Sequence, residues 1–132
     1  MSPIAEMLNQ IKNGQAALKE SVVFPFSNLK LNLLKVLQDH GLIEGVEQHG
    51  RARAKGAKKN LEVFLKYKNK KGVISGLKMV SKPSQRIYVS RKEIPRIKGG
   101  SGLAVISTPR GLMTDREARR KGLGGEVICE IW

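Results

Sequence analysis

The segment Ser107-Thr108-Pro109-Arg110-Gly111 places two hydroxyls, a cation and a glycine directly after a short apolar run. Hydroxyls and backbone N–H groups at a strand-to-helix junction, where we expect this turn, bind phosphate or sugar oxygens. The 2′-hydroxyl of RNA is a good partner because it both donates and accepts hydrogen bonds. The segment therefore favours contact with a nucleic-acid backbone. The alternative is a plain turn in which Ser107 and Thr108 satisfy their own backbone.

A second segment runs from Lys82 to Tyr88. Pro83 fixes a turn that Lys82 and Arg86 flank, and Tyr88 offers a ring that can stack on an unpaired base, worth ~1–3 kcal/mol. The alternative is that Tyr88 is an ordinary cross-strand residue. The chain has three Phe, two Tyr and one Trp, so recognition of several stacked bases on one sheet is not expected.

The third segment is Gly122-Leu123-Gly124-Gly125-Glu126. Its glycines would let a foreign backbone come close. Glu126 is one of few acids in a basic region, and it either accepts hydrogen bonds from base amino groups or pairs with a nearby arginine. The sequence leaves both roles open.

Positive charge is concentrated after residue 50. Residues 1–50 hold four Lys and five acids, whereas residues 51–132 hold 21 Lys and Arg against six acids, and the whole chain has a net charge of +14. A small domain typically carries a net charge of magnitude ~2–8, so the excess predicts a nucleic-acid partner ahead of an anionic membrane. Arg51–Lys59, with five cations and no acid, is predicted to be a hairpin tip that meets an anion, or else a solvated loop.

The residues argue against catalysis and against a metal or cofactor. No phosphate-binding G-x-x-x-x-G-K-[ST] sequence is present. His40 and His49 are expected at a helix end and in a loop, without cysteines or acids at metal-ligand spacing. Cys129 is expected to be a buried thiol, and a single cysteine excludes an intramolecular disulfide. Without a signal peptide or a membrane-spanning apolar run, we expect a cytoplasmic location.

The predicted elements give an α+β fold with two small halves. Helices are expected to begin at Ser2-Pro3 and at the cap Ser27, and strands at Val22–Phe24, Ile43–Glu47 and Leu61–Tyr67 complete an N-terminal αβαββ half. The buried stripes of the two helices are predicted to be Ile4, Met7, Leu8, Ile11 and Leu18, and then Leu29, Leu33, Val36 and Leu37.

The C-terminal half is predicted to be rich in strands, with one short helix. Strands are expected at Val73–Val80, Ile87–Val89 and Leu103–Ile106, followed by a helix over Asp115–Lys121 that the Thr114–Glu117 capping box begins. A final strand carries Val127, Cys129 and Ile131 on one face. We place the domain boundary at residues 70 and 71, with an N-terminal scaffold domain over 1–70 and an RNA-binding domain over 71–132.

In this order, the segments resemble the bacterial-type family of small-subunit ribosomal protein number eight. The sequence 81–88 (SKPSQRIY) resembles the family's S-K-P-G-x-R-x-Y turn. The stretches 107–119 and 122–126 resemble its S-T-x-x-G-x-M-T-D-x-x-A-R run and its closing G-x-G-G-E. Three departures are Ser2, where Asp is usual, Ser84 in place of Gly, and Pro109-Arg110 in place of a commoner Ser-Lys pair.

The resemblance implies a non-enzymatic constituent of the small ribosomal subunit that binds an irregular helix in the central domain of its RNA. It also implies neighbouring ribosomal proteins as partners, and in some members repression of their own operon through a messenger that mimics the ribosomal site. Non-specific nucleic-acid binding and a phosphate-handling enzyme are the rival functions. The RNA-binding residues implied by the resemblance are Lys82, Pro83, Ser84, Arg86, Tyr88, Ser107, Thr108, Arg110, Gly111, Gly124 and Glu126. Lys30 and Lys55 are added mostly on charge.

Overall fold

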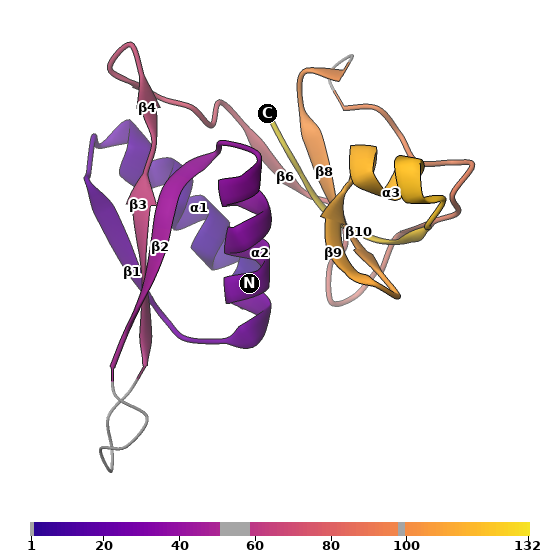
Figure 1. Ribbon diagram of the computed structural model, residues 1–132, viewed down its shortest axis with the longest axis horizontal. Helices are drawn as coiled ribbons and strands as arrows, with labels where there is room; N and C mark the ends of the chain where they lie inside the picture. Colours follow the sequence, from indigo (N-terminus) through magenta and orange to yellow (C-terminus); the bar gives the residue numbers. More distant parts are fainter. Residues whose placement is uncertain (1, 51–58, 98–99) are drawn as a thin grey trace. The chain divides into compact units, whose positions relative to one another are not determined.

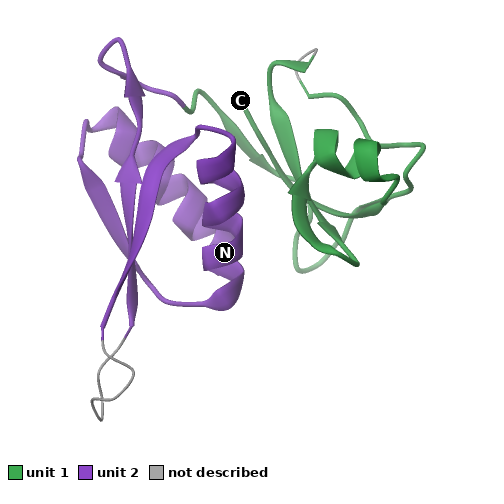
Figure 2. Ribbon diagram, viewed as in Figure 1, with its two compact units in different colours: residues 1–2, 74–132 green, residues 3–73 purple. Residues whose placement is uncertain are grey.

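The computed structural model describes residues 2–50, 59–97 and 100–132. Three helices and antiparallel sheets confirm the predicted α+β fold (Figure 1). The chain forms two compact units, one over residues 3–73 and one over residues 74–132 together with Ser2 (Figure 2).

The first unit has the expected αβαββ order. Its elements are α1 (Pro3–Ala16), β1 (Ser21–Pro25), α2 (Asn28–Asp39), β2 (Ile43–His49) and β3 (Asn60–Leu65). The three strands form an antiparallel sheet in the order β1-β3-β2. A small hairpin of β4 (Tyr67–Lys68) and β5 (Lys71–Gly72) follows. Asn69 and Lys70 have positive φ angles of 53° and 63°, which is typical of a two-residue hairpin turn.

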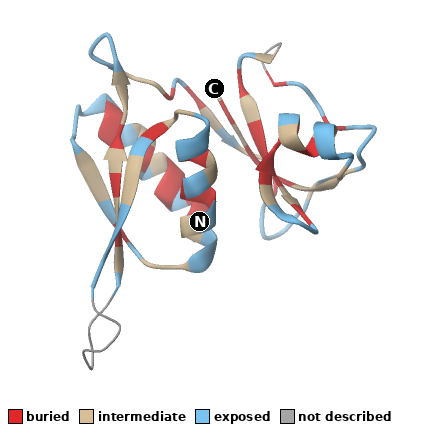
Figure 3. Cartoon of the chain, viewed as in Figure 1, coloured by how far each residue is buried: buried red, intermediate tan, exposed pale blue. Residues whose placement is uncertain are grey.

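One face of this sheet builds the core. The residues of β3 alternate between buried and half-buried, with Leu61, Val63 and Leu65 buried (Figure 3). Helices α1 and α2 pack on that face, since α1 contacts β1 and β3 and α2 contacts β2. Gly14 lies inside α1 because the sheet comes close there: a Cβ at this position would meet the Leu65 side chain at 2.9 Å.

Both predicted helix starts are confirmed, but the buried stripes differ from expectation. α1 begins at Pro3, and the Ser27 hydroxyl accepts a hydrogen bond from the Lys30 N–H at 3.1 Å. Leu18 was wrongly placed on the stripe, because α1 ends at Ala16 and Leu18 has a φ of 57° and is exposed. In α2, Leu34 replaces Leu29 on the buried face, and Leu29 is exposed.

The second unit is one five-stranded sheet with a short helix. Its elements are β6 (Leu77–Met79), β7 (Tyr88–Val89), β8 (Leu103–Thr108), β9 (Gly111–Thr114), α3 (Asp115–Lys121) and β10 (Gly125–Ile131). The strand order is β6-β10-β8-β9, and β7 also pairs with β10. β10 therefore lies between β8 on one side and β6 and β7 on the other. α3 contacts β8 and β9, and Ala118 packs with Ile106 and Met113.

The strand predicted over Val73–Val80 is shorter than expected. The N–H groups of Ser75 and Gly76 both donate to the Trp132 carbonyl, at 2.7 and 2.9 Å. A Cβ on Gly76 would lie 2.2 Å from the Trp132 ring. The Trp132 N–H in turn donates to the Gly76 carbonyl at 3.1 Å, which continues the pairing with β10 by one residue, although β6 itself spans only Leu77–Met79. None of the described helices is both long enough and apolar enough to cross a membrane.

Cys129 is confirmed as a buried thiol, fully shielded in β10. Burial raises the pKa of the Cys129 thiol to about 12. In the unfolded chain the thiol would ionise near its ordinary pKa of about 8.5. Above that pH the unfolded state binds fewer protons, so the free energy of unfolding should fall as the pH rises. We expect the free energy of unfolding of Cys129→Val to fall less than that of the wild type between pH 8 and pH 10, as measured by urea unfolding. An identical decline in the variant would contradict this assignment.

Candidate nucleic-acid interface

The Ser107–Gly111 segment is the turn of a β-hairpin. It joins β8 to β9, and the helix α3 begins only after β9 has ended at Thr114. The expected strand-to-helix junction was wrong, because Leu112–Thr114 pair with Val105–Ser107 before the helix begins. The turn therefore has no helix N-terminus of its own with which to bind an anion.

Within the turn, Thr108 holds the backbone. Its hydroxyl donates to the Gly111 carbonyl at 2.8 Å and accepts from the Arg110 N–H at 3.1 Å, and the residue is buried. Gly111 has a φ of 110°, which disfavours any side chain. Thr108 therefore fits the alternative of a plain turn, in which the hydroxyl is bonded to the protein's own backbone. In contrast, the Ser107 hydroxyl makes no hydrogen bond within the described part of the chain.

The sheet brings the three predicted segments together. Glu126 on β10 lies opposite Tyr88 on β7, and opposite Ser107 on β8. Directly opposed residues of antiparallel strands project from the same face, with Cβ atoms roughly 4.5–5.5 Å apart. Tyr88, Glu126 and Ser107 therefore form one row across three strands, which we call the central row. Its members come from positions 88, 107 and 126 of the chain.

The central row combines an exposed aromatic ring with paired charge. The Tyr88 side chain is 69% exposed, which leaves its ring accessible to a partner. The Arg86 Nη1 lies 3.2 Å from the Glu126 Oε2. The structure thus contains the arginine pair that the sequence offered as one role for Glu126. This pair holds Arg86 beside the row, with more than half of the Arg86 side chain exposed.

The predicted turn at Lys82–Gln85 is present and is stabilised by hydrogen bonds within the segment 81–87. Lys82 and Gln85 exchange backbone hydrogen bonds of 2.9 and 3.0 Å. Ser81, which is buried, accepts a hydrogen bond from the Ile87 N–H at 2.9 Å. Lys82, Pro83 and Ser84 are exposed on this turn. Sequence reasoning included Ser81 in the motif but missed its role of closing the loop.

Gly124 and Gly125 accommodate the protein's own backbone. A Cβ on Gly124 would lie 2.4 Å from the Val89 carbonyl oxygen, and one on Gly125 would lie 2.0 Å from the Ser107 carbonyl oxygen. The expected approach of a foreign backbone is therefore not required to explain these glycines. They allow β7, β10 and β8 to come close enough to form the central row.

We expect Gly125→Ala to destabilise the second unit, because the new methyl group would push against the β8 backbone beside Ser107. Overpacking of this kind costs about 1–3 kcal/mol, measurable by urea unfolding. Gly122→Asn is the matched control. Gly122 has a φ of 65°, no atom lies within 4 Å of the position that a Cβ would take there, and Asn tolerates that conformation. Equal stability of the two variants would contradict the expectation.

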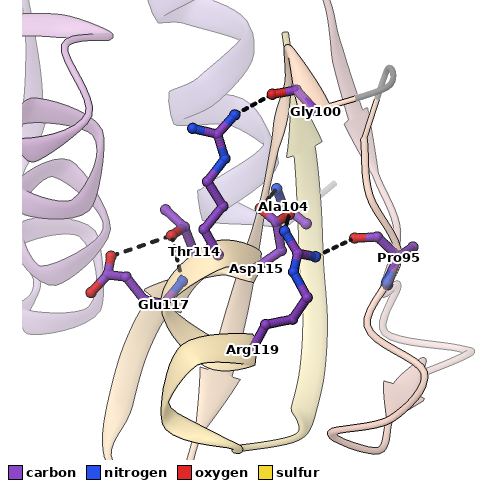
Figure 4. A network of polar contacts seen from close by, with 8 residues as sticks. Pro95, Gly100, Ala104, Thr114, Asp115, Glu117 and Arg119 are labelled. Carbon is purple, nitrogen blue, oxygen red and sulfur yellow. Dashed lines mark hydrogen bonds and ion pairs between the residues drawn. The ribbon is translucent and has the colours of Figure 1, made fainter.

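A buried carboxylate at the start of α3 is hydrogen-bonded to β8 (Figure 4). Asp115 is 1% exposed. It accepts a hydrogen bond from the Ala104 N–H at 3.0 Å and forms an ion pair with Arg119 at 2.8 Å. Arg119 also donates to the Pro95 carbonyl at 3.1 Å. The capping box predicted the helix start correctly, but nothing in the local sequence indicated that its first residue would be a buried charge.

The remaining predicted contacts lie elsewhere. Lys30 is on α2 of the first unit, with its Nζ 3.5 Å from the Pro25 carbonyl. Lys55, with most of the basic Arg51–Lys59 stretch, lies outside the described residues. Residues 3–73 hold 13 Lys and Arg against six acids. The first unit is thus strongly basic, although residues 1–50 alone are nearly neutral.

Known proteins similar to this chain agree on one family. Residues 2–132 match the family model described as ribosomal protein S8. Proteins named small ribosomal subunit protein uS8 are similar over nearly their whole length. The one from Kosmotoga olearia is 51% identical, covering 98% of this chain and 97% of the relative. Those from Desulforudis audaxviator and Syntrophomonas wolfei are 45% and 47% identical, covering 98% of this chain and 97% and 96% of the relatives. The chain therefore belongs to the ribosomal protein S8 family, whose members are structural proteins of the small ribosomal subunit.

Proposed function

We propose that the second unit binds an irregular helix in the central domain of small-subunit ribosomal RNA, early in subunit assembly, and so helps to build the platform. The observation that carries the proposal is the central row. Three segments that were singled out for their chemistry each contribute one residue to this row, on one face of one sheet.

The cations beside the row would supply affinity. Lys82 and Arg110 are exposed, and neither forms an ion pair with a described residue, so both are available for phosphates. Arg86 stays next to the row through Glu126. Contacts of cations with phosphates position a protein on RNA but carry no sequence information.

The uncharged groups of the row would supply selectivity. Tyr88 would stack on an unpaired base, and the Ser107 hydroxyl would exchange hydrogen bonds with a 2′-hydroxyl or a base edge. Thr108 and Gly111 shape the turn that presents Arg110, while Gly124 permits the close strand packing. Pro83 and Ser84 shape the neighbouring turn. Lys30 and Lys55 would add contacts from the first unit, which would also meet neighbouring ribosomal proteins.

A filter-binding assay at controlled salt tests the proposal. The protein would be mixed with the central-domain fragment of small-subunit ribosomal RNA, and separately with a scrambled-loop RNA of equal length. We expect at least ~100-fold preference for the authentic fragment, or roughly 2.7 kcal/mol. Equal binding to both would instead indicate a non-specific nucleic-acid-binding protein.

The salt dependence of the same assay tests the phosphate contacts. If the protein neutralises about six phosphates, log K should fall with log salt at a slope of about −5. A slope near −1 would contradict this proposal.

The rival enzymatic function is tested with Ser107→Ala plus Thr108→Ala. That change would abolish turnover of some phosphate substrate if the turn were catalytic, whereas we expect loss of RNA affinity.

A further inference from the structure

Three side chains that can bind a metal lie together on the sheet of the first unit. Glu47 and His49 are two residues apart on β2, and Glu62 on β3 lies directly opposite Glu47. One ligand atom from each of the three lies within 4.8 Å of the others. The expectation that His49 lies in a loop, without acids at metal-ligand spacing, was wrong. β2 extends to His49, and its pairing with β3 brings Glu62 beside it.

The cluster is already ordered by hydrogen bonds. The His49 Nε2 lies 2.8 Å from the Glu62 Oε1 and 3.7 Å from the Glu47 Oε2. The Ser21 hydroxyl on β1 donates to the other oxygen of Glu62, at 2.6 Å. Ser21 thereby fixes the carboxylate and leaves Oε1 directed at His49. Hydrogen bonds from Ser21 and then from His49 lower the pKa of Glu62.

The charges of the cluster do not balance by themselves. Like charges directly opposite one another on a sheet are destabilising. A single imidazole carries at most one positive charge against the carboxylates of Glu47 and Glu62. The cluster therefore retains negative charge on the surface of a chain whose net charge is +14, and a divalent cation would neutralise it.

One imidazole nitrogen and two carboxylate oxygens form a ligand set that suits Zn²⁺. With bonds of about 2.0–2.2 Å, tetrahedral ligand atoms would lie roughly 3.3 Å apart. The distances from the His49 Nε2 to the Glu62 and Glu47 oxygens, 2.8 and 3.7 Å, lie on either side of that value. A water molecule would take the fourth position. A hydrogen-bonded partner behind a ligand, as Ser21 is behind Glu62, is characteristic of metal sites in proteins.

We propose that Glu47, His49 and Glu62 form a surface zinc site, with Ser21 as a positioning residue for Glu62. The bound ion would join β2 to β3 beside the pair formed by His49 and Asn60. This site belongs to the first unit and does not depend on the proposed RNA contacts of the second.

The test is a Zn²⁺ titration of the RNA-free, full-length protein, by calorimetry and by NMR of the imidazole signals. We expect one Zn²⁺ per chain, with a shift of the His49 signals. His49→Gln and Glu62→Gln should each weaken Zn²⁺ binding at least tenfold. Ser21→Ala should weaken it roughly 10-fold, which is the smaller of the effects typical for loss of a residue that supports a metal ligand. His40→Gln is the matched control and should bind as wild type does, because His40 is the other histidine of the chain.

Thermal unfolding without metal checks that each variant folds. Added Zn²⁺ should raise the unfolding midpoint of the wild type and of His40→Gln, but not that of His49→Gln. The proposal is overturned if no saturable binding occurs up to millimolar Zn²⁺. It is equally overturned if His49→Gln binds Zn²⁺ as tightly as wild type, since binding would then occur at other groups.

Discussion

The double variant Tyr88→Ala plus Ser107→Ala is expected to lose most of its specific affinity for ribosomal RNA. Stacking of a base on Tyr88 is worth ~1–3 kcal/mol, and a hydrogen bond of the Ser107 hydroxyl contributes about 0.5–1.5 kcal/mol. Together they amount to about 1.5–4.5 kcal/mol, or roughly 10- to 2000-fold in the dissociation constant. The measurement is filter binding to the central-domain fragment at fixed salt.

Controls separate recognition from folding and charge. Tyr88→Phe keeps the ring and should retain the stacking contribution, while Ser90→Ala removes an exposed serine outside the central row and should bind as wild type does. Because Tyr88 is 69% exposed, its loss should leave the thermal midpoint nearly unchanged. The salt slope should also stay the same, since neither residue neutralises a phosphate. Wild-type affinity in the double variant would rule out the central row as the RNA contact.

The second large effect is expected at Asp115. Asp115→Ala would remove the acceptor of the buried Ala104 N–H and the partner of Arg119 together. Breaking a buried ion pair by removing one partner typically costs about 3–5 kcal/mol. That is a large part of the ~5–15 kcal/mol by which a domain is usually stable. Urea unfolding should therefore show a much lower midpoint, with loss of RNA binding as a consequence.

Two variants locate the cause of this loss. Asp115→Asn keeps an oxygen for the Ala104 N–H but not the charge for Arg119, so its effect should be intermediate. Arg116→Ala removes a neighbouring cation that is exposed and contacts the Gly100 carbonyl, and surface changes of this kind are usually within ~0.5 kcal/mol. If Asp115→Ala were as stable as Arg116→Ala, the buried network would have no role in stability.

Local patterns in the sequence predicted the local features of the fold. The Thr114–Glu117 capping box predicted α3, and the alternation of Leu61, Val63 and Leu65 predicted the buried face of β3. Both signals depend on residues within one turn or one strand. For the same reason, the predicted order of elements in the first unit is correct.

Features that depend on pairing between distant segments could not be predicted. Nothing near Ser107 indicates that it lies opposite Glu126, or that Glu62 lies beside His49, because strand register is set by the whole sheet. Gly124 and Gly125 were predicted to let a foreign backbone come close. The carbonyl groups that in fact crowd them belong to β7 and β8, which are distant in the sequence. Leu18 and Leu29 fit a helical spacing and are still exposed, because spacing does not show where a helix ends or how far its buried face extends.

The position of β10 in the sheet has a consequence for biosynthesis. β6 and β7 both pair with β10, which is the last strand of the unit to be made. β6 ends at Met79 and β10 begins at Gly125, a separation of 46 residues, which takes roughly 2–9 s at ~5–20 residues per second. During this delay the hairpin of β8 and β9 can close, but β6 and β7 have no partner strand.

Unpaired strands expose hydrogen-bonding edges that favour association with other chains. The nascent second unit is therefore exposed to association with other chains until β10 is made. The first unit has by then been synthesised, because its strands β1 to β3 lie within residues 21–65. Because Glu126 lies in the middle of the central row, this row forms only when β10 pairs with β7 and β8. A half-made chain would thus hold a folded first unit before the central row has formed.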